Sequence, residues 1–153
     1  LVKDVDYKKL PVHQNIQISE IYLRAKDRKE QVRIRKRGQN GSYLYFLTRK
    51  KINRENESYI EEEELITEQE FHTLKNLIDP KTTVVEKERI CFLWNNQYFE
   101  LDSYKGTNEG ITILEAKHVP TFISIKKNIT GDPKYSTRNM ARKKTLNDKM
   151  LDC

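Results

Sequence analysis

The sequence predicts a mostly β protein of the α+β class: an antiparallel closed barrel of about eight strands, with one inserted helix and a C-terminal helix. Three observations predict this fold. Short segments of alternating apolar and polar residues follow one another along the 153-residue chain, turn-forming residues separate them, and one internal segment has helical spacing. Antiparallel strands joined by short turns often close into a barrel.

The first half of the chain is predicted to form strands over 15–23, 31–37, 42–48 and 57–66. Val32 and Ile34 alternate with arginines, which is the period of a strand with one buried face. The Gly-Gln-Asn-Gly stretch at 38–41 has strong turn chemistry, so residues 32–47 are expected to form a hairpin. An irregularity is expected near Ser19, and four consecutive Glu residues weaken the strand propensity of the last segment.

A short helix is predicted after these strands. Thr67-Glu-Gln-Glu70 has the sequence of a capping box, Phe71 and Leu74 begin an apolar stripe, and Pro80 ends the segment. Three further strands are expected over 82–94, 97–104 and 110–117.

These elements divide the chain into a predicted barrel domain over 12–130 and a basic helical tail over 131–153. The tail combines basic with apolar residues: Arg138, Arg142, Lys143, Lys144 and Lys149 with Met140, Leu146 and Met150. Two interpretations stay open, namely that it binds acidic lipid or a partner domain, or that it packs on the barrel as a terminal helix. Because the chain does not begin with Met, we expect it to be the C-terminal part of a longer protein.

The overall charge favours an anionic partner. Lys and Arg total 29 against 23 Asp and Glu, a net charge of +6. Nucleic acid is the least favoured anion, because no nucleic-acid fingerprint appears and few aromatics interleave the basic residues. No apolar run is long enough for a membrane-spanning helix. Two Cys and no signal peptide predict a cytoplasmic location, with peripheral membrane contact through the basic tail as an option.

Charged residues recur at every second position on several predicted strands. The pairs are Arg33 and Arg35, Lys87 and Arg89, Glu62 and Glu64, and Glu100 and Asp102. On an open sheet such pairs are ordinary solvated residues, but in a closed barrel they would project into one lumen. Charge buried on that scale requires pairing, water or a ligand. A polyphosphate with a divalent metal fits, because Arg and Lys bind phosphate oxygens and carboxylates bind the metal.

The order of these motifs resembles the CYTH, or triphosphate-tunnel, superfamily. The matching segments are Arg33-Ile34-Arg35, Leu47-Thr48-Arg49-Lys50, Glu62-Glu63-Glu64, Lys87-Glu88-Arg89, Glu100-Leu101-Asp102 and Leu114-Glu115-Ala116-Lys117. The resemblance implies a basic tunnel with Mg²⁺ or Mn²⁺ as its metal. It implies phosphate contacts from Arg33, Arg35, Lys50, Lys87, Arg89 and Lys117. It also implies metal contacts from Glu62, Glu64, Asp102 and Glu115.

A closer resemblance covers several longer segments, namely Val32–Gly38, Phe92–Tyr104, Leu114–Ala116 and Ile129–Ser136. They are similar to the CYTH-like C-terminal half of the eukaryotic P-loop family of the TRP-channel translocation-defect protein. This resemblance implies a partner P-loop domain within the same protein, GTP binding by that longer protein, and binding of phosphoinositide or phosphatidic acid. This chain itself contains no Gly-x-x-x-x-Gly-Lys-[Ser/Thr] motif.

Two departures from the superfamily pattern bear on catalysis. The signature Glu-x-Glu-x-Lys falls on Gln17–Ile21, which keeps neither the carboxylates nor the Lys in place, unless a bulge near Ser19 brings Glu20 into register. Lys117 stands where the last strand should carry its second acid. Metal-dependent hydrolysis requires carboxylates that hold the ion and orient water. The sequence therefore predicts a tunnel that binds phosphorylated anions with weak or no catalysis.

Three functions remain distinct at this point. The first is binding of a nucleotide, a polyphosphate or a phospholipid headgroup in the basic tunnel. The second is metal-dependent triphosphate hydrolysis. The third is a protein-interaction or scaffold module, in which the charges of the lumen only satisfy one another.

Overall fold

The computed structural model describes residues 1–53, 55 and 58–143 of the chain. Its strands and helices are β1 (Val2–Val5), β2 (His13–Leu23), β3 (Glu30–Gln39), β4 (Ser42–Asn53), β5 (Ser58–Ile66), α1 (Glu68–Leu74), β6 (Val85–Trp94), β7 (Gln97–Lys105), β8 (Thr112–Glu115), β9 (Ile123–Ile125) and α2 (Thr137–Ala141). None of the helices in these described ranges is long and apolar enough to cross a membrane.

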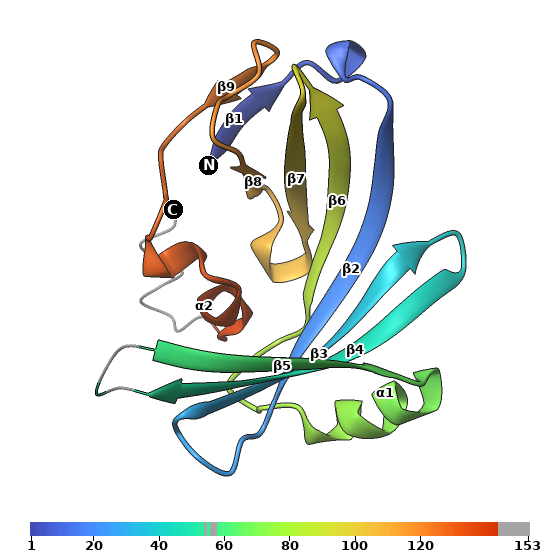
Figure 1. The fold of residues 1–153 in the computed structure, drawn as a ribbon, viewed down its shortest axis with the longest axis vertical. Coiled ribbons are helices and arrows are strands. Elements are labelled where there is room, and N and C mark those ends of the chain that lie inside the picture. The colour runs from blue at the N-terminus through green and yellow to red at the C-terminus, as the bar shows by residue number, and fades with distance from the viewer. Residues whose placement is uncertain (54, 56–57, 144–153) are drawn as a thin grey trace.

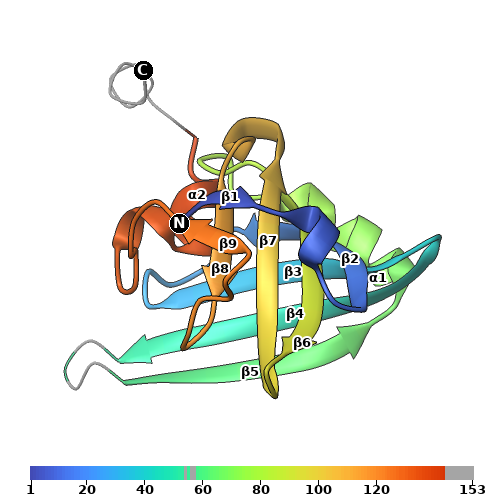
Figure 2. The same cartoon turned by 90° about the horizontal axis from the view of Figure 1, so that it is seen from above.

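Within the described residues, seven strands form one antiparallel sheet in the order β5-β4-β3-β2-β6-β7-β8. β3, β4 and β5 run at a steep angle to β6 and β7, so the sheet curls around a concave face (Figures 1 and 2). The mostly β, antiparallel fold class is confirmed. The predicted closure is not made by hydrogen bonds, because the edge strands β5 and β8 do not pair in the described part of the chain. β8 is only four residues long and pairs with β7 alone.

Turn chemistry sets the register of both long hairpins. Asn40 and Gly41 have positive φ angles of 52° and 81° and join β3 to β4, as the turn at 38–41 predicts. Asn95 and Asn96, with φ angles of 52° and 60°, join β6 to β7 in the same way.

The Thr67 N-cap predicted before α1 is confirmed. The Thr67 hydroxyl accepts a hydrogen bond from the backbone N–H of Glu70 and donates one to the Glu70 carboxylate, each at 3.1 Å. Phe71 of this helix is buried against the outer, convex face of the sheet, where it joins Ile21, Ile34 and Leu47. The cap therefore holds α1 over one half of that face.

A second, two-stranded sheet of β1 and β9 covers the other half of the outer face. The sequence patterns did not predict these two short strands. Val5 and Ile123 pack there against Phe92, Phe99 and Leu101 of β6 and β7. Two apolar clusters, one under α1 and one under the β1–β9 sheet, therefore form on the outer face.

The C-terminal segment packs on the concave face. Met140 and Ala141 of α2 are buried against Tyr22, Val85 and Tyr104. Within the described part of the tail, this packing agrees with the interpretation of a terminal helix on the sheet, and α2 there spans Thr137–Ala141. The basic residues Lys144 and Lys149, with Leu146 and Met150, lie outside the described residues.

Candidate anion-binding site

Strand alternation sends a cluster of charged side chains to the concave face. β2 lies between β3 and β6 without a bulge from Gln17 to Leu23, and Glu20 is opposite Arg35 on β3. The cluster comprises Glu20 of β2, Arg33 and Arg35 of β3, Lys87 and Arg89 of β6, and Asp102 of β7. Residues that are distant in sequence therefore meet on one face, as predicted for the arginine and lysine pairs.

Glu20 is the centre of one half of this cluster and is fully buried. Its carboxylate lies 3.1 Å from Nη2 of Arg35, 3.6 Å from Nη1 of Arg33 and 3.6 Å from Nζ of Lys87. A buried carboxylate is tolerated only when its charge is compensated, and three cations compensate this one.

Asp102 is the centre of the other half. Nε and Nη2 of Arg89 donate hydrogen bonds of 2.8 and 3.0 Å to its two oxygens, and Nζ of Lys87 lies 3.2 Å away. Nη1 of Arg89 also lies 2.7 Å from the Glu100 carboxylate. Lys87 bridges the two halves, so the cluster is one continuous network.

The electrostatics of the network keep both acids ionised. Burial alone would raise the pKa of Glu20, but the positive charges of Lys87, Arg35 and Arg33 outweigh it and lower that pKa. Burial likewise opposes the ionisation of Asp102, and the hydrogen bonds from Arg89 with the charge of Lys87 lower its pKa.

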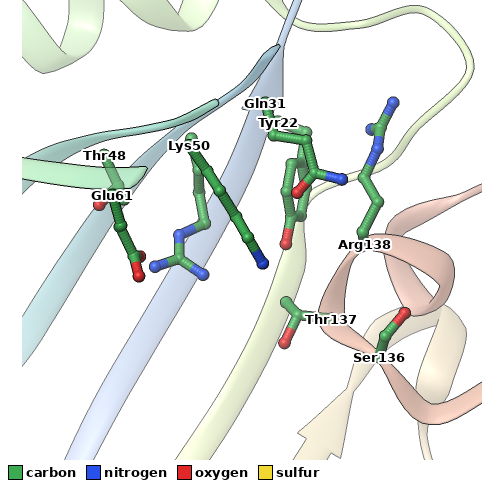
Figure 3. A pocket seen from close by; sticks show the side chains of 9 residues that line it. Tyr22, Gln31, Thr48, Lys50, Glu61, Ser136, Thr137 and Arg138 are labelled. Atoms are coloured by element: carbon green, nitrogen blue, oxygen red, sulfur yellow. The ribbon is translucent and has the colours of Figure 1, made fainter. Parts of the chain in front are cut away.

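A cavity of about 300 Å³ adjoins the network between the sheet and α2 (Figure 3). Its lining residues are Tyr22, Gln31, Arg33, Thr48, Lys50, Glu61, Ser136, Thr137 and Arg138. Figure 3 shows Lys50 and Tyr22 extending from the strands toward Thr137. Burial raises the pKa of Tyr22, so its hydroxyl stays protonated and is able to donate a hydrogen bond to an anion.

Three polar atoms of the lining residues are buried and have no hydrogen-bond partner among the described residues: Nε of Arg33, Oγ1 of Thr48 and Nη1 of Arg138. Thr48 is only 4% exposed. Two of the three are cationic donors and the third is a hydroxyl, which is the donor set that binds phosphate oxygens.

Arg138 reaches this cavity from the C-terminal segment, and sequence patterns assigned it only to the basic tail. Its Nη2 donates a 2.8 Å hydrogen bond to the Asp79 carboxylate, and its guanidinium lies 5.0 Å from the centre of the Tyr22 ring. Asn108 also donates a 3.0 Å hydrogen bond to the carbonyl of Met140. These contacts fix α2 beside the cavity.

The structure does not bring all the predicted residues together. Glu62 and Glu64 pair with Arg49 and Leu47 and share their outer face, while the neighbouring Glu61 lies opposite Lys50 on the concave face. The expectation that Glu62 and Glu64 project into the lumen with the arginines is therefore wrong by one residue of register.

Glu115 lies opposite Glu100 on the concave face, beside the network, and Lys117 follows it at the β8 edge. With Glu100, Tyr98 and Gln97 they line a separate cavity of about 540 Å³ at the β8 edge. Glu100 links this cavity to the network through Arg89, whereas Lys117 does not line the cavity that contains Arg33 and Lys50.

The predicted metal ligands do not form a metal site. Among the described residues, no three His, Cys, Asp or Glu side chains lie close enough to hold an ion. Both oxygens of Asp102 already accept hydrogen bonds from Arg89, and the Glu20 carboxylate is surrounded by three cations. Asp102 therefore has no oxygen free of Arg89, whereas both oxygens of Glu20 are buried and accept no hydrogen bond within the described residues.

The fold is similar to that of solved structures. Crystal structures of the hypothetical protein NE1496 and of the inorganic triphosphatase NE1496 superpose with TM-scores of 0.65 and 0.64. The chain shares this fold. The identities are 20% and 22%, over 90% of this chain and 92% and 89% of the other chains. This likeness supports the CYTH-like fold that the motifs implied. No family model matches the chain, and no curated protein does.

Proposed function

We propose that this chain binds a phosphorylated anion on the concave face of its sheet, in the cavity beside α2. The observation that carries the proposal is the convergence of Arg33, Lys50 and Arg138 on one cavity, whose lining residues also include three buried polar atoms that have no hydrogen-bond partner within the described residues. Glu61 is the only carboxylate among the nine lining residues, so positive charge dominates the lining. Guanidinium and ammonium groups with a hydroxyl are the usual ligands of phosphate.

The remaining predicted cations belong to the charged network next to the cavity. Arg35, Lys87 and Arg89 do not line the cavity but belong to the network that includes Arg33. Glu20, Asp102 and Glu100 compensate most of their charge, so these cations hold Arg33 in place and do not themselves contact the ligand. The resemblance still predicts a phospholipid headgroup as ligand and a partner P-loop domain that binds GTP. The basic residues of the tail still predict membrane contact.

The proposal is tested by phosphorus NMR of pyrophosphate and tripolyphosphate with the purified chain. We expect the resonances to shift or broaden, and Lys50→Ala to weaken the affinity about tenfold, because a hydrogen bond to a charged group is worth about 1.5–3 kcal/mol. Lys51→Ala is the matched control, since Lys51 is exposed on the opposite face of the same strand. Unperturbed resonances, or equal effects of the two variants, would contradict the proposal.

Triphosphate hydrolysis is the second candidate, and the fold shared with the inorganic triphosphatase NE1496 favours it. A metal carried in by the polyphosphate would neutralise phosphate charge and orient water. The same NMR experiment with Mg²⁺ distinguishes the two functions. Growth of an orthophosphate signal that Lys50→Ala slows would establish hydrolysis, whereas a constant tripolyphosphate signal with shifted resonances would establish binding alone.

A further inference from the structure

Three cations of the network, Arg35, Lys87 and Arg89, already have protein carboxylates as counter-ions. Arg35 and Lys87 lie against Glu20, while Lys87 and Arg89 lie against Asp102. Glu20 is fully buried on the central strand β2. Because its carboxylate is enclosed by Arg33, Arg35 and Lys87, its negative charge is a fixed part of the site.

The cavity meets this network at one residue. Arg33 both lines the cavity and contacts Glu20, whereas Arg35, Lys87 and Arg89 lie beyond it. A phosphate chain that continued from the cavity toward those cations would meet the carboxylates of Glu20 and Asp102. It would have to displace them from their cations, or lie beside them uncompensated, and both are unfavourable in a buried site.

From this geometry we propose that the Glu20 carboxylate is a permanent counter-ion of Arg33, Arg35 and Lys87. It takes the place that the further phosphate groups of a polyphosphate would occupy, and it limits the site to one phosphoryl group. The ligand class is then a phosphate monoester rather than a triphosphate. This inference rests on the proposed function and assigns Glu20 as its specificity-determining residue. Glu20 acts through Arg33, Arg35 and Lys87, and it does not itself contact the ligand.

The lining of the cavity suits a single phosphoryl group. A phosphate monoester carries a charge of about −1.5 to −2 near pH 7 and has three acceptor oxygens. Arg33, Lys50 and Arg138 supply three cations from β3, β4 and α2, and Thr48 adds a buried hydroxyl. Three cations from three elements therefore match the three acceptor oxygens of one phosphoryl group.

The test is calorimetric titration of the chain with methyl phosphate, pyrophosphate and tripolyphosphate at an ionic strength of about 0.15 M. In the unmodified chain we expect tripolyphosphate to bind less than about tenfold more tightly than methyl phosphate, a difference under about 1.4 kcal/mol. A larger preference for tripolyphosphate would overturn the inference.

Glu20→Gln keeps the side-chain shape and removes the charge. We expect it to increase the ratio of tripolyphosphate to methyl phosphate affinity at least about tenfold over the same ratio in Glu86→Gln. Glu86 is exposed on β6, so this control makes the same change in net charge away from the site. Equal ratios in the two variants would remove the role assigned to Glu20.

Three further outcomes are distinguishable. If near-UV circular dichroism shows that Glu20→Gln does not fold, the affinity series of the unmodified chain decides the inference by itself. If none of the three anions binds to the unmodified chain, the proposed function fails. If tripolyphosphate binds far more tightly than methyl phosphate, the proposed function stands and the restriction by Glu20 fails.

Discussion

The two faces of the seven-stranded sheet carry opposite kinds of side chain, although the same strands build both. On β7, Phe99 and Leu101 point to the outer face and are fully buried in an apolar core. Glu100 and Asp102 alternate with them and point to the concave face, where they contact Arg89. The outer face is stabilised by the removal of apolar surface from water, and the concave face by charge compensation.

This difference indicates which face of the sheet is available to bind a ligand. The apolar part of the outer face is covered by α1 and by the β1–β9 sheet and packs within the protein. The concave face contains donors without protein partners and a cavity lined by cations. Substitutions on the outer face should therefore change stability alone, whereas substitutions on the concave face should change anion binding as well.

Phe99→Ala is expected to have the largest effect on stability. Phe99 is fully buried and stacks on Phe92 with ring centres 5.1 Å apart. Removing a buried aromatic ring costs about 3–5 kcal/mol, because apolar contacts are lost and a cavity remains. Urea unfolding followed by fluorescence measures this loss. A loss under about 1 kcal/mol would show that the outer face is not the main core.

Asp102→Asn should destabilise the concave face by about 2–3 kcal/mol, less than the usual loss for a broken buried ion pair because Glu100 still contacts Arg89. Lys87 would lose one of its two counter-ions. The control is Asp4→Asn, which makes the same charge change at an exposed position of β1. Equal unfolding free energies for the two variants would mean that the network contributes no stability.

Stability should fall in acid because of the concave face. The pKa values of Glu20 and Asp102 are lowered in the folded chain from ordinary values of 4.5 and 3.8. A lowered pKa stabilises the fold fully above the ordinary value, and this contribution is lost as the pH falls through the lowered value. We therefore expect the unfolding free energy to be level near neutral pH and to decline below about pH 4.

Asp102→Asn tests this prediction, because it removes one of the two carboxyls of the network whose pKa is lowered. The acid decline measured by urea unfolding at a series of pH values should be shallower in the variant than in the unmodified chain. Phe99→Ala, which changes no charge, should keep the original slope at a lower stability. A variant slope as steep as the original would place the acid sensitivity outside the network.

Thr67→Ala should have the smallest effect, about 1 kcal/mol, because it removes one N-cap hydrogen bond from α1 on the outer face. Thr67→Ser retains the capping hydroxyl and should lie close to the unmodified chain. Thermal unfolding of both variants measures the difference. If Thr67→Ala weakened phosphate binding, the claim that substitutions on the outer face change stability alone would be wrong.

Local patterns were sufficient to predict most of the fold. The alternation of Val32 and Ile34 with arginines, the turn at 38–41 and the N-cap at Thr67 each act over a few residues, and the structure confirms each of them. β1 and β9 escaped prediction because strands of four and three residues are too short to show a period. Their pairing depends on contacts between distant segments of the chain.

The site was predictable only in part, for physical reasons. Arg33 and Arg35 share a face by strand geometry alone, but nothing within the run of four glutamates specifies which pair of them points inward. Pairing of Lys50 with Glu61 decides it, and a slip of one residue exchanges the faces. Glu20 follows Ile16 and Ile18 at intervals of two residues, so strand alternation places all three side chains on one face of β2. This spacing is the one sequence signal that places Glu20 on the face of the network.

The most direct test of the anion site is a crystal structure of the chain grown with pyrophosphate. We predict electron density for the anion in the cavity on the concave face, with phosphate oxygens in contact with Arg33 and Lys50. Density confined to the separate cavity beside Lys117, or to the outer face, would contradict the account. Density at the predicted place in the unmodified chain and its loss in Lys50→Ala would establish the concave face as the binding surface.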